Sequence, residues 1–154
     1  MILGLHHVAI CVPDIRQAIS FYCGILGFTE FAKSERDGNN PLSDKAIGIP
    51  CVAASIRMIK AGPVFIELWQ YRNPAPRPQI PERQVSDHGY THICLQVQDI
   101  EAEHLRLSSA GMCFVGPPVH YGAISAVYGR DPFGNIVEIY EVHDAADENI
   151  ASIL

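Results

Sequence analysis

The amino-acid sequence predicts an α+β fold of two tandem modules, each with the element order strand–helix–strand–strand–strand. The first observation is a strand with a histidine followed by an Asp-led helix, which occurs twice, as LHHVAICVPD (residues 5–14) and THICLQVQD (residues 91–99). The second is a pair of similar later strands, FIELW (residues 65–69) and IVEIY (residues 136–140). The third is their spacing, since both copies of the early pattern lie 85 positions apart and both copies of the late pattern lie 71 apart. Such regular self-similarity indicates an internal repeat.

The first module, residues 1–72, begins with a strand whose two faces differ. Because side chains alternate along a strand, His6, Val8 and Ile10 share an aliphatic face, while His7 lies on a face of small apolar residues. Asp14 is a candidate N-cap, and Gly27 is a candidate C-terminal stop of the helix between them. We predict the remaining elements as a strand (28–35), a loop by composition that either covers a site or projects from the surface (36–50), and a hairpin (51–60 and 63–71).

A connector rich in proline and arginine, residues 73–88, separates this module from the second, residues 89–142. Asp99 is the predicted N-cap of a helix that ends near Ala110, and DPFG (131–134) is a strong turn signal between two strands. The strands expected in this module are 91–97, 112–115, 124–129 and 135–142. The acidic tail, residues 143–154, is expected either to dock as a helix through Ile150, Ile153 and Leu154 or to remain loose.

Composition restricts the classes of protein to which the chain can belong. With 154 residues and 48% hydrophobic residues, it can bury a sizeable core and is too apolar for disorder. A net charge of −6 and the lack of a dense basic block argue against nucleic acid and anionic membranes as partners. The five cysteines include no C-x-x-C pair, so we expect reduced, mostly buried thiols rather than disulfides or a thiolate zinc site. Without a basic leader or an 18-residue apolar stretch, cytoplasmic placement is expected.

The repeated motifs resemble those of the vicinal oxygen chelate superfamily, which includes glyoxalases, bleomycin resistance proteins and extradiol dioxygenases. The resemblance rests on HHVAICVPD, FYCGILGF, PVFIELW, YTHICLQVQD and RDPFGNIVEIYE, in this order. It implies two βαβββ modules forming a curved mixed sheet around a central cleft, with the first and last strands of each module side by side. It also implies that the family's four metal-ligand positions are occupied by His7, Glu67, His92 and Glu138. Family members often pair, so a homodimer is expected.

Two imidazoles and two carboxylates are a donor set that suits one divalent ion per site, such as Zn, Ni, Co, Mn or Fe. Such an ion would also supply the positive charge that Glu67 and Glu138 need among apolar and aromatic side chains. Single histidines are more often structural or surface residues than ligands, and the other five are interpreted in that way: His6, His88, His104, His120 and His143.

Glu67 at the fourth ligand position resembles the glyoxalase I and methylmalonyl-CoA epimerase branch of the family. That resemblance implies a metal-dependent lyase or isomerase that binds a small carbonyl substrate and moves an α-proton through an enediolate or enolate. The expected base is Glu138, alone or with Glu67. Two alternatives stay open at this point, namely an extradiol-type ring-cleaving dioxygenase and a metal-free antibiotic-binding resistance protein.

Four further residues are candidates for contact with the substrate. Trp69 and Tyr71 share the face of Glu67, and Tyr121 lies near the expected mouth of the site, although ordinary aromatic packing explains each as well. Arg130 could neutralise an anionic substrate group, or it is a solvated residue beside the DPFG turn. No pocket for glutathione or coenzyme A is identifiable in the sequence.

Overall fold

The computed structural model describes residues 1–143, and the chain divides into two compact units, Met1–Pro78 and Gln79–Leu154. The division falls inside the proline-rich segment that the sequence analysis marked as a connector. The predicted tail lies outside the described residues, apart from His143. Within residues 1–143, no helix is long and apolar enough to cross a membrane.

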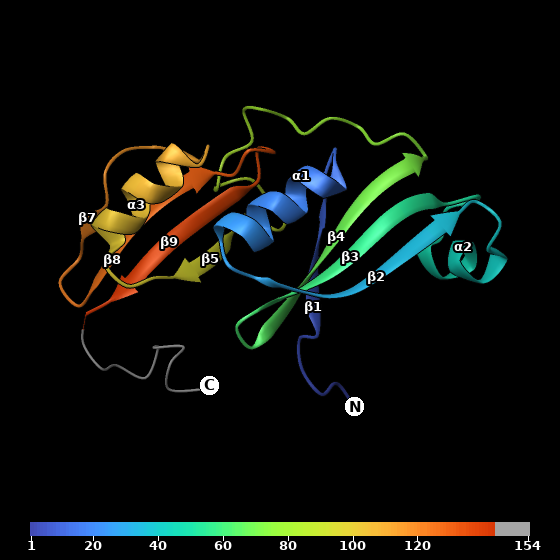
Figure 1. The fold of residues 1–154 in the computed structure, drawn as a ribbon, viewed down its shortest axis with the longest axis horizontal. Coiled ribbons are helices and arrows are strands. Elements are labelled where there is room, and N and C mark those ends of the chain that lie inside the picture. Colours follow the sequence, from blue (N-terminus) through green and yellow to red (C-terminus); the bar gives the residue numbers. More distant parts are fainter. Residues whose placement is uncertain (144–154) are drawn as a thin grey trace. The chain divides into compact units, whose positions relative to one another are not determined.

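The first unit is a four-stranded sheet covered by a short helix (Figure 1). The strand order is β1-β4-β3-β2, with β1 parallel to β4 and the other pairs antiparallel. Asp14 caps α1 by accepting hydrogen bonds from the backbone N–H groups of Arg16 and Gln17, as predicted, and a π-helical segment follows from Ser20 to Ile25. The elements are β1 (His7–Cys11), α1 (Ile15–Ile19), β2 (Thr29–Asp37), α2 (Pro41–Ile47), β3 (Ala53–Ala61) and β4 (Val64–Asn73).

The prediction of a loop over residues 36–50 is wrong, because this segment contains α2. Asn40 is its N-cap, with Oδ1 accepting a hydrogen bond from Ser43 N at 3.0 Å, and Pro41 fits the first turn because its fixed φ suits a helix start. Gly48 ends the helix in the left-handed region, with φ of 78°. The residues that look like loop residues in the composition therefore act here as helix caps.

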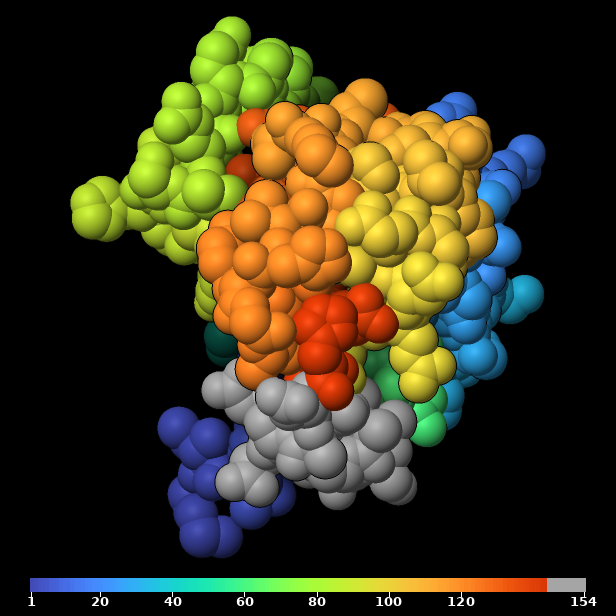
Figure 2. All heavy atoms as spheres, turned by 90° about the vertical axis from the view of Figure 1, so that its left-hand side faces the viewer, coloured from blue at the N-terminus to red at the C-terminus, as the bar shows by residue number. Residues whose placement is uncertain are grey.

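The second unit repeats this topology with strand order β5-β9-β8-β6, and β7 also pairs with β8. Its first and last strands, β5 and β9, are again parallel neighbours. The α+β fold and the adjacency of first and last strands are therefore confirmed in each unit. The two-residue strand β7 was not predicted. The elements are β5 (Ile93–Gln96), α3 (Ile100–Ser109), β6 (Cys113–Phe114), β7 (Val119–His120), β8 (Ile124–Arg130) and β9 (Ile136–Val142). Figure 2 shows one surface of this unit, where α3 lies beside the segment 113–130.

Strand alternation separates a core from a second face in each unit. Helix α1 packs against β3 and β4, and α3 packs against β9. Leu68 of β4 and Ile139 of β9 are fully buried, as are Ile100 and Leu107 of α3 at 1% exposure. The neighbours of Leu68 and Ile139 in sequence, Glu67 and Glu138, are directed to the opposite face of their strands.

The cysteines differ from expectation in one respect. All five are free thiols, as predicted, but Cys11, Cys51, Cys94 and Cys113 are exposed and only Cys23 is partly buried. The expectation of mostly buried thiols is therefore wrong. Cys11 and Cys94 alternate to the sheet face that carries no helix in their units, which explains their exposure.

A buried serine, Ser55 of β3 in the first unit and Ser125 of β8 in the second, binds side chains of the segments beside its strand. In the first unit, Ser55 Oγ donates to Glu35 Oε2 at 2.7 Å and accepts from Arg72 Nη1 at 2.8 Å. In the second, Ser125 Oγ lies 2.5 Å from His120 Nδ1 and 2.6 Å from His143 Nε2. This arrangement fits the interpretation of His120 and His143 as structural residues. The same polar position is thus built from permanent charges in one unit and from imidazoles in the other.

Gln70 and Glu141 occupy repeat-related positions, and each binds the start of the helix in its own unit. Gln70 Oε1 accepts from Ile15 N at 3.0 Å, whereas Glu141 accepts from Asp99 N at 2.7 Å and Ile100 N at 3.1 Å. The hydrogen bond from Ile100, together with that from Asp99, holds the pKa of Glu141 below its ordinary value of 4.5.

This geometry predicts that Glu141→Gln lowers stability near neutral pH more than at acid pH. A carboxylate with a lowered pKa contributes stability that is present above pH 4.5 and is lost as the pH falls through its folded-state pKa. We expect a loss of about 0.3–1 kcal/mol at neutral pH, typical of a solvent-accessible carboxylate at a helix N-terminus. Urea unfolding of both proteins at neutral and acid pH measures the difference. A gap between the two proteins that stays constant with pH would contradict this assignment.

Candidate metal centre

In the first unit, the structure brings together His7 of β1 and Glu67 of β4. The parallel register places Ala9 opposite Glu67, so the glutamate lies two residues beyond the histidine along the paired strands. The distance between His7 Nε2 and Glu67 Oε2 is 3.6 Å, and the side chains are 37% and 19% exposed. Trp69 Nε1 donates a hydrogen bond of 2.5 Å to the same Glu67 oxygen, which fixes the orientation of the carboxylate.

In the second unit, His92 precedes β5 and lies beside Glu138 of β9. The register places Cys94 opposite Glu138, so the glutamate again lies two residues beyond the histidine. His92 Nε2 and Glu138 Oε2 are 3.2 Å apart, and the side chains are 27% and 13% exposed. The two histidine–glutamate pairs therefore have the same construction in the two units.

The four predicted ligands are thus found as two pairs, one in each unit. Within residues 1–143, no group of three or more His, Cys, Asp and Glu side chains is close enough to hold a metal ion together. Each pair taken alone offers one imidazole nitrogen and one carboxylate. The difference between the repeat spacings of 85 and 71 positions is explained by α2 and its flanking turns, which lengthen the connection between β2 and β3 in the first unit only.

Two residues beside Glu138, Tyr128 and Cys94, are not among the predicted site residues. Tyr128 of β8 lies directly opposite Glu138, and its ring centroid is 5.1 Å from that of His92. Burial first, and the hydrogen bond to Glu138 second, raise the pKa of Tyr128. Although Cys94 is exposed as a residue, removal of its sulfur from water and the Glu138 charge raise the pKa of its thiol to about 12. Cys94 therefore stays a neutral thiol.

The two glutamates are not equivalent, because the position that corresponds to Tyr128 in the first unit is Met58, opposite Glu67. The cross-strand neighbours of Glu138 are a phenol and a thiol, whereas Glu67 accepts a hydrogen bond from the indole of Trp69. The repeat relates the residue opposite Glu67 to the residue opposite Glu138. These two residues, Met58 and Tyr128, nevertheless differ in chemistry.

The four candidate substrate residues occupy different environments. Trp69 and Tyr71 stack on one another, with ring centroids 5.1 Å apart and planes at 17°, on the strand face that carries Glu67. Tyr121 is 65% exposed and precedes β8. Arg130 donates to the carbonyl oxygens of Gly134, at 2.8 Å, and Arg83, so its guanidinium braces the DPFG turn and the end of the connector. The predicted turn is confirmed, because Asp131 accepts hydrogen bonds from Phe133 N and Asn135 N.

Comparison with known proteins agrees with this construction. The family model described as Glyoxalase/Bleomycin resistance protein/Dioxygenase superfamily matches residues 4–139. A 2-epi-5-epi-valiolone epimerase from an Actinomyces species is 32% identical over 146 residues, which covers 89% of this chain and 78% of the relative. The uncharacterised protein YaeR of Escherichia coli K12 is 31% identical over 144 residues, covering 90% of this chain and 98% of the relative.

Solved structures share the fold. A glyoxalase family protein from Bacillus cereus has a TM-score of 0.84 at 24% identity and covers 94% of this chain and 97% of its own. The fosfomycin resistance protein FosX of Listeria monocytogenes, solved with Mn(II) and sulfate, has a TM-score of 0.59 at 17% identity, covering 92% and 93%. Together with the match over residues 4–139, these similarities show that the chain belongs to the glyoxalase/bleomycin resistance protein/dioxygenase superfamily.

Proposed function

We propose that the protein is a divalent-metal-dependent isomerase of the epimerase type, which moves the α-proton of a small carbonyl compound. The observation that carries the proposal is the occurrence of one histidine–glutamate pair, built in the same way, in each unit. The similarity to an epimerase at 32% identity favours proton transfer over the ring-cleaving and metal-free alternatives.

The geometry of each pair fits ligation of a metal ion. Two ligand atoms bound about 2.1 Å from one ion at about 90–110° lie about 3.0–3.4 Å from each other. The separation of 3.2 Å in the second unit lies in this range, and that of 3.6 Å in the first exceeds it by a few tenths of an ångström. The presence of Mn(II) in the Listeria FosX structure, which has the same fold, is consistent with a divalent ion. These distances support each pair as ligands of a divalent ion, and, as the family resemblance implies, we propose His7, Glu67, His92 and Glu138 as the ligands of one ion.

The chemistry of an epimerase assigns roles to these residues. A divalent ion held by the four ligands would polarise the substrate carbonyl and make the neighbouring C–H more acidic. Inversion at a carbon requires removal of a proton from one face and return of a proton to the other. We propose Glu138 as the base that takes the α-proton, because its cross-strand neighbours are the phenol of Tyr128 and the neutral thiol of Cys94. Glu67, oriented by Trp69, is the candidate for the return step.

The proposal predicts metal-dependent exchange of the substrate α-proton with deuterated solvent. Protein stripped with a chelator and reloaded with Zn, Ni, Co, Mn or Fe would be incubated with three kinds of carbonyl compound: a 2-oxo acid, a thioester such as methylmalonyl-CoA, and 2-epi-5-epi-valiolone as the hydroxy-carbonyl. Mass spectrometry should show deuterium at the α-carbon of at least one compound, only in metal-loaded samples. Metal-loaded protein that exchanges none of them, or that consumes oxygen with catechols, would contradict the proposal.

A further inference from the structure

The residue immediately before each candidate histidine ligand binds the imidazole nitrogen that faces away from the glutamate. His6 Nδ1 lies 2.8 Å from His7 Nδ1, and Thr91 Oγ1 lies 2.8 Å from His92 Nδ1. In both units, Nε2 of the same ring is the atom that faces the carboxylate. His6 and Thr91 are 85 positions apart, like the histidines that they contact. Two chemically different residues therefore make the same contact at repeat-related positions.

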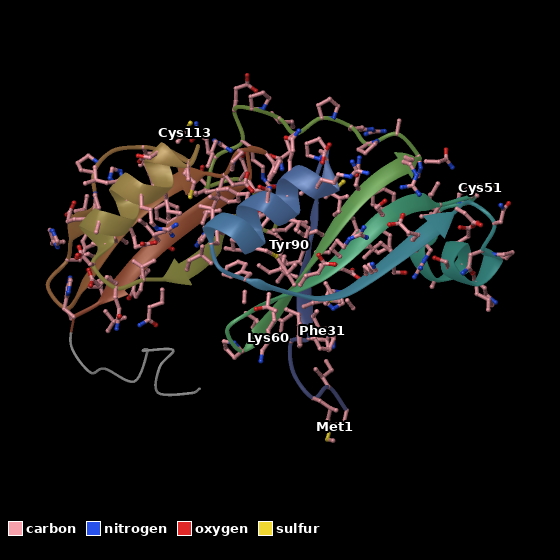
Figure 3. The ribbon with its side chains drawn as sticks, viewed as in Figure 1. Met1, Phe31, Cys51, Lys60, Tyr90 and Cys113 are labelled. Atoms are coloured by element: carbon pink, nitrogen blue, oxygen red, sulfur yellow. The ribbon has the colours of Figure 1, made fainter. Side chains whose placement is uncertain are left out.

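This contact is unusual for neighbours in a strand, whose side chains point to opposite faces. It arises because β1 begins at His7 and β5 at Ile93, so His6 and Thr91 stand outside the regular strand. The His6 ring is also held from its other side, since it stacks on Phe65 with ring centroids 5.6 Å apart and planes at 18°. Phe65 in turn contacts Phe31, at 5.2 Å. Figure 3 shows Phe31 and Lys60 at this end of the first sheet.

The contact determines which nitrogen of the imidazole can bind a metal. A neutral imidazole has one N–H donor and one nitrogen with a free lone pair, and the partner of one nitrogen decides the state of the other. For Nε2 to bind a cation, the proton must lie on Nδ1, and its neighbour must accept a hydrogen bond. The unprotonated Nδ1 of His6 and the hydroxyl oxygen of Thr91 can both do so.

We propose that His6 and Thr91 are positioning residues, which hold His7 and His92 in the tautomer and orientation that present Nε2 as a metal ligand. This inference rests on the proposed function, because it assumes that His7 and His92 bind the ion. It revises the interpretation of His6 as a purely structural histidine. Residues that accept the second ring N–H of a metal-bound histidine typically contribute 10- to 100-fold to metal affinity.

Two substitutions remove the hydrogen-bond acceptor of His6 or of Thr91 and preserve the rest of the side chain as far as possible. His6→Phe keeps an aromatic ring for stacking on Phe65 but lacks the nitrogen, and Thr91→Val keeps the shape of threonine but lacks the hydroxyl. His6→Asn and Thr91→Ser retain an acceptor. His104→Phe is a matched control, since His104 also contacts a phenylalanine ring, that of Phe114 at 4.6 Å, but bonds neither candidate ligand.

The test measures zinc affinity by chelator competition and the tautomers of His7 and His92 by nitrogen-15 NMR of the zinc-free proteins. We expect His6→Phe and Thr91→Val each to weaken zinc binding by about 10- to 100-fold. His6→Asn, Thr91→Ser and His104→Phe should bind zinc nearly as wild type does. In wild type, both histidines should carry the proton on Nδ1.

The outcomes separate this inference from the proposed function. Tight zinc binding that is unchanged in His6→Phe and Thr91→Val overturns the inference while leaving the metal site intact. Nδ1 protonation of His7 and His92 that is equally complete in the zinc-free forms of both variants also overturns it. A wild-type protein that binds no divalent ion overturns the proposed function itself.

Discussion

Replacing Glu138 with glutamine is expected to slow α-proton exchange by about 10²- to 10⁴-fold, the usual contribution of a positioned general base. Glutamine keeps the size of the side chain and one oxygen for the metal but cannot accept a proton at neutral pH. Cys94 of β5 and Tyr128 of β8 lie directly opposite Glu138 on the two neighbouring strands. Exchange rates in deuterated solvent, measured with metal content on the same sample, give the result.

Two companion variants decide how that loss is interpreted. Glu141→Gln changes the same residue type three positions along β9, but Glu141 binds the start of α3 and should leave the exchange rate unchanged. Glu67→Gln should reduce net epimerisation more than exchange if Glu67 returns the proton. A metal-loaded Glu138→Gln protein that exchanges at the wild-type rate would rule out Glu138 as the base.

Replacing Leu68 with alanine is expected to lower the free energy of unfolding by about 2–5 kcal/mol, the range for truncation of a fully buried leucine. Leu68 is 0% exposed, on the strand β4 against which α1 packs. The substitution removes apolar contacts and leaves a cavity that the closely packed interior refills only in part. Urea denaturation followed by circular dichroism measures this loss.

The same strand provides the control for Leu68. Val64, also on β4, is 42% exposed, so Val64→Ala should change stability by no more than about 0.5 kcal/mol. Ile139→Ala, at the repeat-related buried position of β9, should resemble Leu68→Ala. If Leu68→Ala were as mild as Val64→Ala, the assignment of this strand face to the core would be wrong.

The parts of the fold that depend on side-chain alternation could be predicted from the sequence. The alternation of β1 and β4 placed His7 and Glu67 on one face and Leu68 on the other, and the structure agrees. The prediction failed for residues 36–50, because asparagine and proline are common both in loops and at the start of helices such as α2. Only the backbone conformation at Asn40 and Gly48 distinguishes the two cases.

The candidate site could be predicted only in part, because the repeat identifies residues but not their neighbours. His92 and Glu138 were predicted from the repeat together with the family resemblance, and the structure places them 3.2 Å apart. The contact of Tyr128 with Glu138 depends on the antiparallel register of β8 and β9, which spacing does not give. The contact of Thr91 with His92 depends on where β5 begins, and strand alternation would have directed these two side chains apart.

The central claim is that one divalent ion is bound by both histidine–glutamate pairs, and metal analysis of protein purified without chelator tests it most directly. We predict about one ion per chain, lost on removal of either pair, in His7→Ala/Glu67→Ala or in His92→Ala/Glu138→Ala. Circular dichroism should show that both double variants remain folded. Protein that contains no ion, or that retains its ion when one pair is removed, would contradict the claim.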